Sequence, residues 1–297
     1  MGADDRGGHA VEAFVTHRNL LFTVAYELLG SAADAEDVLQ ETWLRWADAD
    51  LAAVRDQRAY LVRITTRLSL NRLRAVGRRR ESYVGSWLPE PLLTAPDVAD
   101  DVELAESVSM AMLLVLETLA PTERAVFVLR EVFDLTYDEI AQAVDKSTAT
   151  VRQIAHRARA HVAARRPRGM VSPDESRRVL TAFQVALETG NVQGLLDVLA
   201  PDAVLLGDGG GIKQAVLRPV IGADKVARLL CSTHLRVATM ALHPAEVNGH
   251  PALILRLDGA LDTVVALRID DGLISGVYAV RNPEKLSHVR RATALRR

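Results

Sequence analysis

The distribution of charge constrains this 297-residue chain more than any other feature of its sequence. The segment Arg63 to Arg80 holds seven arginines and no acidic residue, and Arg152 to Arg168 holds six arginines and no acidic residue. Between them, Asp97 to Glu106 holds five acidic residues and no basic one. Because like charges repel, each basic segment needs a polyanionic partner, whereas the acidic segment avoids one. We therefore predict two separate nucleic-acid contacts joined by a connector, although the net charge is only −2.

Length and composition bound the remaining possibilities. The chain is long enough for two or three domains, and its 49% hydrophobic and 25% charged residues are typical of a folded protein. We expect no signal peptide and no membrane segment, because no long uninterrupted apolar run occurs. The single cysteine, Cys231, excludes an internal disulfide and fits a reducing compartment. These observations predict a cytoplasmic protein with no membrane partner, and the sequence indicates no metal, nucleotide or redox cofactor.

The first third of the chain has the apolar spacing of helices. Gly30 is placed to end a first helix, Ser31 with Asp34 resembles a capping box that opens a second, and a third begins near Asp56. On the third helix a polar stripe falls within about 80° of arc; it consists of Arg63, Arg67, Asn71, Arg74 and Arg78. An isolated stripe of this kind would be a solvated face. Here no acidic residue compensates the arginines, so phosphate binding is the better interpretation.

A second helical region follows a proline-containing linker at 82–100. Thr136 and Glu139 form another capping box, and a turn at 145–147 separates two helices in a helix-turn-helix pattern. The start of a recognition helix meets base edges. The side chains there that point away from the apolar stripe are Thr148, Arg152, Gln153 and His156. We expect phosphate contacts, which position the protein, from Arg157, Arg159, Arg165 and Arg166.

The pattern changes again after residues 167–173. One helix is followed by β-rich runs, with hairpin signals at Asn248-Gly249 and Asp271-Gly272. These signals predict antiparallel strands at 251–257, 262–269 and 273–280. The last ten residues are polar and basic, and we expect them to be frayed.

Three runs closely resemble regions 2 and 4 of extracytoplasmic-function (ECF) sigma factors: DAEDVLQETWLRW at 34–46, YLVRITTRLSLNRLR at 60–74, and LAPTERAVFVLREVFDLTYDEIAQAVDKSTATVRQIAHRAR at 119–159. The resemblance covers about half of the chain, with the motifs in the family's order. It implies that the first run binds core RNA polymerase, through Asp34, Glu36, Asp37, Gln40, Glu41 and Trp43. It also implies that the second run melts and reads the −10 promoter element through Arg67, Asn71 and Arg74, although many members carry asparagine where this chain has Arg67. The third run would read the −35 element through Arg152, Gln153 and His156.

Three further motifs are similar to a subgroup of these sigma factors that ends in a SnoaL-like domain: SWLPEPL at 86–92, DGGG at 208–211 and NPEKL at 282–286. The resemblance implies two all-α sigma domains, the second with a helix-turn-helix, and a C-terminal α+β domain with a curved antiparallel sheet. Its cavity could hold an unknown small ligand. We predict a regulatory contact between linker and domain through Trp87, Leu88, Pro89, Asp208, Gly209, Gly210, Gly211, Asn282 and Pro283.

The expected organisation is sigma region 2 at 8–82, a linker at 83–103, region 4 at 104–168, a SnoaL-like regulatory domain at 172–288 and a basic tail at 289–297. The acidic stretch at 97–106 is expected to follow the positively charged path of nascent RNA, an expectation that rests on charge alone.

Two other functions compete with this interpretation. The first is a helix-turn-helix regulator with a ligand-sensing domain, which would need neither the acidic and aromatic helix at 34–46 nor a second basic helix. The second is a SnoaL-type isomerase or hydrolase, with Asp202, Asp208, His234 and His243 as candidate groups. Loop acids and scattered histidines are usually solvated, and a fold alone confers no activity. We therefore predict a sigma factor with no catalytic residues.

Overall fold

The computed structural model describes residues 3–80, 83–94, 102–165, 171–234, 240–289 and 292–296. The chain divides into two compact units. The first unit comprises residues 1–81, 115–166 and 294–297, and the second comprises 82–114 and 167–293. The described linker, residues 83–94, therefore belongs to the same unit as the C-terminal α+β domain.

The first unit begins with three helices, α1 (Ala3–Leu29), α2 (Ala32–Ala47) and α3 (Gln57–Arg80), with a short 3₁₀ turn η1 (Leu51–Ala53) before α3. Gly30 adopts a φ of 65° after α1, a conformation that glycine reaches without strain. The Ser31 hydroxyl then accepts a hydrogen bond from the Asp34 N–H at 3.1 Å, which caps α2. These helix ends confirm the sequence pattern.

A buried tryptophan connects the three helices. Trp46 is fully buried, its indole Nε1 donates to the Ala10 carbonyl at 2.9 Å, and its ring lies 5.7 Å from that of Tyr60. The hydroxyls of Thr42 and Thr65 meet at 3.2 Å in the same core. These contacts join α1, α2 and α3, and burying paired polar groups in this way fixes how the three helices pack in the bundle.

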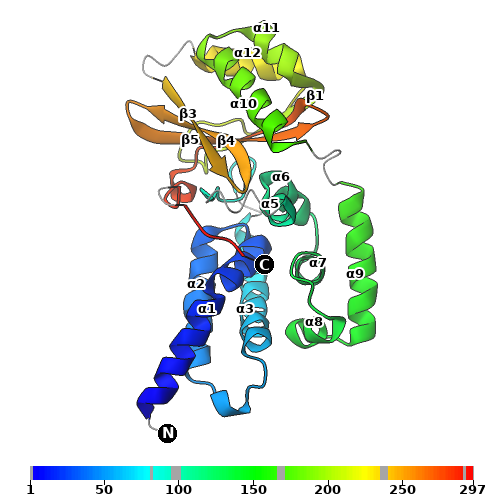
Figure 1. The fold of residues 1–297 in the computed structure, drawn as a ribbon. Coiled ribbons are helices and arrows are strands. Elements are labelled where there is room, and N and C mark those ends of the chain that lie inside the picture. Colours follow the sequence, from blue (N-terminus) through cyan, green and yellow to red (C-terminus); the bar gives the residue numbers. More distant parts are fainter. Residues whose placement is uncertain are drawn as a thin grey trace. The chain divides into compact units, whose positions relative to one another are not determined.

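The second part of this unit is the expected helix-turn-helix, with α7 (Pro121–Glu131), α8 (Tyr137–Val144) and α9 (Thr148–Ala163) (Figure 1). Thr136 and Glu139 make the predicted reciprocal capping box at the start of α8. Asp145 adopts a left-handed φ of 55° and ends α8, and Ser147 caps α9. The turn predicted at 145–147 is confirmed.

One buried arginine connects the helix-turn-helix to the three-helix bundle. Arg124 of α7 is 2% exposed; its Nε donates to the Glu27 carbonyl at 3.1 Å, and its Nη1 lies 2.6 Å from Glu117 Oε1. Leu295 is also buried, and the Arg296 N–H donates to the Thr23 hydroxyl at 3.1 Å. The prediction of a frayed tail is therefore wrong for these residues, because the hydrogen bond to Thr23 and the buried Leu295 side chain hold a segment that composition alone marks as solvated.

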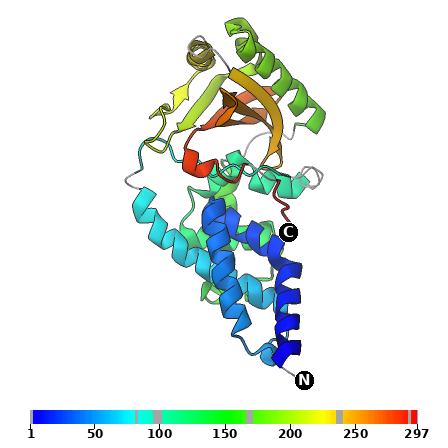
Figure 2. The same ribbon diagram turned by 90° about the vertical axis from the view of Figure 1, so that its left-hand side faces the viewer.

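The second unit contains a six-stranded mixed sheet in the order β2-β1-β6-β5-β4-β3. Figure 2 shows the curved arrows of this sheet, drawn mainly in orange and red. Its strands are β1 (Leu199–Asp208), β2 (Val220–Ile221), β3 (Met240–Val247), β4 (His250–Leu257), β5 (Ala260–Asp270) and β6 (Leu273–Val280). Its helices are α5 (Val102–Val108), α6 (Met110–Leu116, whose last two residues belong to the first unit), α10 (Pro173–Glu188), α11 (Val192–Val198) and α12 (Ala223–His234), and η2 (Pro283–Lys285) is a 3₁₀ turn.

The strand and turn predictions hold at this end of the chain with one correction. Asn248-Gly249 and Asp271-Gly272 have positive φ at both positions, as two-residue hairpin turns require. The three predicted strands correspond to β4, β5 and β6, which pair antiparallel as expected. However, β1 pairs parallel with β6, so the sheet is mixed rather than wholly antiparallel. The crossover from β1 to β6 spans the other strands, and periodicity cannot reveal such a connection.

The two faces of the sheet are covered by different segments. Side chains alternate along β5, so that Val265 faces one core with Phe183 of α10, and Val264 faces another with Leu88 of the linker. Leu88 and Leu92 are almost completely buried. Thr94 N–H donates to the Glu246 carbonyl, and the Thr293 N–H donates to the Leu93 carbonyl at 2.7 Å. The linker is therefore a structural layer of the C-terminal domain.

The acidic connector is described only in part. Residues 95–101, which include three of its acids, lie outside the described residues, and Glu103 and Glu106 lie on α5. The expected path along nascent RNA stays a prediction.

Candidate functional sites on the helical unit and the linker

The predicted polymerase-binding residues lie on α2. Asp34 and Asp37 both accept from Arg72 of α3, at 2.6 and 2.8 Å. Glu36 pairs with Arg18 at 2.8 Å, and the Trp43 ring contacts Phe14 edge-on at 5.3 Å. Asp37, Gln40 and Glu41 are exposed at helical spacings of three and four, so they share one face. The salt bridges also correct the charge argument: Arg72, within the first basic segment, is neutralised by acids of α2.

The predicted −10 residues follow one side of α3. Arg67, Asn71 and Arg74 are exposed, and Arg63 lies over the Tyr60 ring at 4.8 Å. The side chain of Arg78 lies outside the described residues. Arg67 Nη2 donates to the Gln142 carbonyl of α8 at 2.8 Å, so a residue expected to meet promoter DNA contacts the helix-turn-helix in the free chain. The −10 role of Arg67 stays a prediction.

The predicted −35 residues lie on α9. Val151, Ile154 and Ala155 are buried, whereas Arg152, Gln153, His156 and Arg157 are exposed on the other side. Thr148 donates to Asp138 at 2.6 Å, and Arg165 is exposed at the end of the helix. The structure therefore brings the base-reading candidates onto one open face.

Arg159, predicted as a phosphate contact, has partners within the chain, and its phosphate role stays a prediction. Its Nε pairs with Glu131 Oε1 at 2.8 Å and its Nη2 donates to the Tyr137 hydroxyl at 3.0 Å. These bonds raise the pKa of Arg159, because both favour the charged guanidinium. Arg166 lies outside the described residues.

The predicted regulatory residues meet around Asp208, at the end of β1. Asp208 is fully buried, and its carboxylate accepts from the Tyr83 hydroxyl at 2.6 Å, the Leu88 N–H at 2.9 Å and the Gly210 N–H at 3.0 Å. Its second oxygen also pairs with Lys285 Nζ at 2.7 Å. We call this cluster of Tyr83, Trp87, Leu88, Asp208, Asn282 and Lys285 the linker knot.

Lys285 is the positive centre of the linker knot. Besides Asp208, its Nζ donates to the Leu88 carbonyl at 2.6 Å and lies over the rings of Trp87 at 4.2 Å and Tyr83 at 4.9 Å. Burial, followed by the bond to Asp208, raises the pKa of the Tyr83 hydroxyl, so this phenol remains a donor. Lys285 lies in the NPEKL motif, but neither Lys285 nor Tyr83 was predicted from the sequence to be a contact residue.

Two glycines are sterically required beside the knot. A Cβ on Gly209 would lie 2.0 Å from the Lys213 carbonyl oxygen, and one on Gly210, at a φ of 63°, would lie 2.3 Å from Asn282 Nδ2. Asn282 in turn donates to the Tyr83 hydroxyl at 2.9 Å. Pro89 is buried with the linker and Pro283 is exposed. The DGGG motif therefore permits backbone approach, as glycine does in tight turns.

A second contact holds the linker at the β3–β4 turn. Asn248 Oδ1 accepts from the Leu92 N–H at 3.0 Å, and its Nδ2 donates to the Val108 carbonyl at 2.8 Å. The neighbouring His250 hydrogen-bonds the backbone of Ala105 near Glu106; burial, the largest influence, lowers the pKa of His250.

This histidine gives the contact a pH dependence. Below the ordinary histidine pKa of about 6.5, the unfolded chain takes up a proton that the folded chain resists. The free energy of unfolding should therefore fall as pH drops, by at most about 1.4 kcal/mol per pH unit for this group. His250→Gln should reduce that slope between pH 7 and 5 in urea unfolding. His17→Gln, which removes another histidine of lowered pKa, serves as a matched comparison; an unchanged slope in His250→Gln would contradict the assignment.

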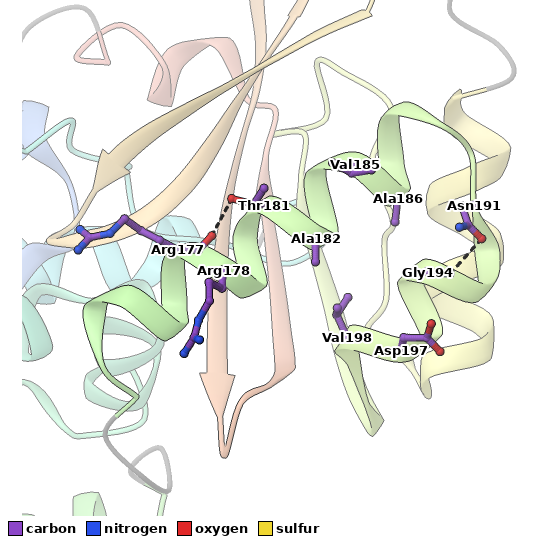
Figure 3. A pocket seen from close by; sticks show the side chains of 10 residues that line it. All are labelled: Arg177, Arg178, Thr181, Ala182, Val185, Ala186, Asn191, Gly194, Asp197 and Val198. Atoms are coloured by element: carbon purple, nitrogen blue, oxygen red, sulfur yellow. Dashed lines mark hydrogen bonds between the residues drawn. The ribbon is translucent and has the colours of Figure 1, made fainter.

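The candidate catalytic groups do not converge. Asp202 and His243 are exposed, Asp208 belongs to the linker knot, and the side chain of His234 lies outside the described residues. A cavity of about 610 Å³ lies between α10 and α11 (Figure 3). Polar groups along it have local partners: Thr181 donates to the Arg177 carbonyl, and Asn191 accepts from the Gly194 N–H. The small ligand stays a prediction.

Among the described residues, no group of histidine, cysteine or carboxylate side chains is arranged to hold a metal. No helix within the described part of the chain is long and apolar enough to cross a membrane.

Comparison with known families identifies two regions of the chain. Residues 13–79 match Sigma-70 region 2, and residues 109–162 match Sigma-70 region 4. Both matches are to regions of sigma-70 factors.

Relatives extend the match over nearly the whole chain. The ECF RNA polymerase sigma factor SigJ of Mycobacterium tuberculosis is 34% identical over 291 residues, covering 93% of each chain. The probable sigma factor SigI of the same species is 34% identical over 281 residues, covering 94% of this chain and 95% of its own. The crystal structure of SigJ superposes with a TM-score of 0.76 at 33% identity, covering 94% of this chain and 98% of that one. The chain belongs to the ECF RNA polymerase sigma factors, with an additional C-terminal α+β domain.

Proposed function

We propose that this sigma factor engages core RNA polymerase through α2, reads the −10 element through α3 and reads the −35 element through α9, acting in the cytoplasm. The exposed acidic face of α2 and the separate basic faces of α3 and α9 support this assignment of roles. Arg67, Asn71 and Arg74 would contact the −10 element, and Arg152, Gln153 and His156 would read the −35 element.

The C-terminal domain modulates this activity by holding the linker. The single observation that carries the proposal is the buried Asp208 carboxylate, which binds the linker at Tyr83 and Leu88 and binds Lys285 of the NPEKL motif. The segment between the two predicted DNA-binding regions is thereby held by the C-terminal domain. A domain that favours one linker arrangement shifts the equilibrium between arrangements, typically by about 1–3 kcal/mol.

Two truncations test this coupling in run-off transcription with purified core polymerase. Ending the chain before Asn282 removes Lys285 and Asn282 but leaves Asp208, whereas ending it before Asp208 removes the knot and most of the sheet. We expect both to change promoter output, and by different amounts. If both transcribe like the full-length chain, the C-terminal domain does not modulate this sigma factor.

A further inference from the structure

Tyr137 occupies the first position of α8, facing the recognition helix. The preceding capping box fixes the backbone at this point, and the side chain is half-buried. The position of the Tyr137 ring is therefore fixed by the start of α8, and the ring offers a well-defined surface to neighbouring side chains.

Three arginines surround this ring. The Arg130 guanidinium lies 5.1 Å from the ring centre, that of Arg152 lies 5.7 Å away, and Arg159 bonds the hydroxyl at 3.0 Å. All three distances are within the range of favourable cation–aromatic or hydrogen-bond contacts.

The three arginines differ in what else holds them. Arg130 also donates to the Leu135 carbonyl and pairs with Asp134, and Arg159 pairs with Glu131. Arg152 makes no hydrogen bond or ion pair in the part of the chain that the structure describes, so its donors remain available. The Tyr137 ring lies against this exposed side chain.

We propose that Tyr137 is a positioning residue that pre-orients Arg152 for reading the −35 element. The proposal rests on the base-reading role given to Arg152 above. A long arginine side chain loses considerable rotamer freedom when it engages a base edge. If the Tyr137 ring already limits the conformations of Arg152, less rotamer freedom is lost on binding. The resulting gain in binding free energy applies only to the base pair that accepts both guanidinium donors. The effect is on sequence preference more than on overall affinity.

The experiment uses holoenzyme assembled from full-length chain and core polymerase, transcribing a promoter library randomised at the −35 element. Preference is the ratio of transcripts from preferred and single-base-changed promoters. Arg152→Ala should reduce it on the order of 5- to 150-fold at one or two positions. Tyr137→Leu should reduce it about three- to tenfold at the same positions, and Tyr137→Phe, which keeps the ring, should retain it.

The base-reading role of Arg152 and the positioning role of Tyr137 are tested separately. If Arg152→Ala leaves the preference unchanged, the base-reading role itself is wrong. If Arg152→Ala lowers it but Tyr137→Leu does not, the positioning role is overturned, and equal losses in Tyr137→Phe and Tyr137→Leu would assign the effect to the hydroxyl and Arg159 instead.

A double substitution separates positioning from a fold defect. In the Arg152→Ala background, Tyr137→Leu should cause no further loss of preference, because the side chain it positions is absent. A further loss of the same size would show that Tyr137 acts through the helix-turn-helix as a whole and would contradict the proposal.

Discussion

Replacing Asp208 by alanine is expected to lower the free energy of unfolding by about 3–5 kcal/mol. The substitution leaves the Lys285 ammonium buried, with a side chain only 8% exposed, and without its ion-pair partner. It also removes the acceptor of the Leu88 N–H and the Tyr83 hydroxyl. Urea unfolding followed by tryptophan fluorescence measures the loss, and hydrogen exchange at the Leu88 amide should accelerate.

The controls for this result lie in the same domain. Asp202→Ala, on the exposed part of β1, should change the free energy of unfolding by less than about 0.5 kcal/mol. Combining Asp208→Asn with Lys285→Met should recover much of the loss, because no buried charge is left unpaired. A loss in Asp208→Ala no larger than that in Asp202→Ala would show that the linker knot is not an important stabilising contact.

Charge reversal at Asp37 is expected to abolish binding to core polymerase while leaving the fold intact. The Asp37 side chain is 58% exposed, and its pair with Arg72 contributes at most about 1 kcal/mol at such a surface. Asp34 remains to pair with Arg72 in the Asp37→Arg variant. Co-purification with core enzyme measures binding, and thermal unfolding verifies the fold.

An equal charge reversal elsewhere on the same bundle provides the comparison. Glu12 is exposed on α1 and outside the predicted surface, so Glu12→Arg should retain core binding. Unchanged co-purification of Asp37→Arg would remove the exposed face of α2 from the polymerase interface. Equal loss in both variants would indicate a nonspecific charge effect.

The local features of the fold were predictable because their causes are local. Capping at Ser31 and Thr136, the turn at 145–147 and the Asn-Gly hairpin each depend on residues within a few positions of one another. The Asp258-Gly259 turn carries the same signal and joins β4 to β5 with positive φ at both residues. That dipeptide in the sequence therefore also predicts the hairpin turn between β4 and β5.

Long-range partners could not be predicted in this way. The parallel pairing of β1 with β6 depends on a crossover through the whole domain. Likewise, the sequence places Arg72 in a basic segment without acids, whereas acids of α2 pair with it in the structure. The pairing of Arg159 with Glu131 could not be predicted either. Apolar spacing reveals which face of a helix is buried but not which charged group meets it.

The linker knot could be predicted only in part. Its motifs identified Trp87, Leu88, Asp208 and Asn282, since unusual glycines and prolines mark places where backbone must come close. The chemistry of the contact was not evident, because Lys285 reads as an ordinary surface lysine in the sequence. Only its position between two aromatic rings and a buried carboxylate gives it a structural role.

The most direct test of linker control is single-round run-off transcription by holoenzyme containing Asp208→Asn, compared with wild type at saturating core polymerase. This substitution preserves the shape of the side chain and changes none of the predicted DNA or polymerase contacts. If the C-terminal domain modulates initiation through the linker, promoter output should change by about fivefold or more, as a shift of at least about 1 kcal/mol requires. Output equal to that of wild type, with the Leu88 amide shown to be released, would contradict the account.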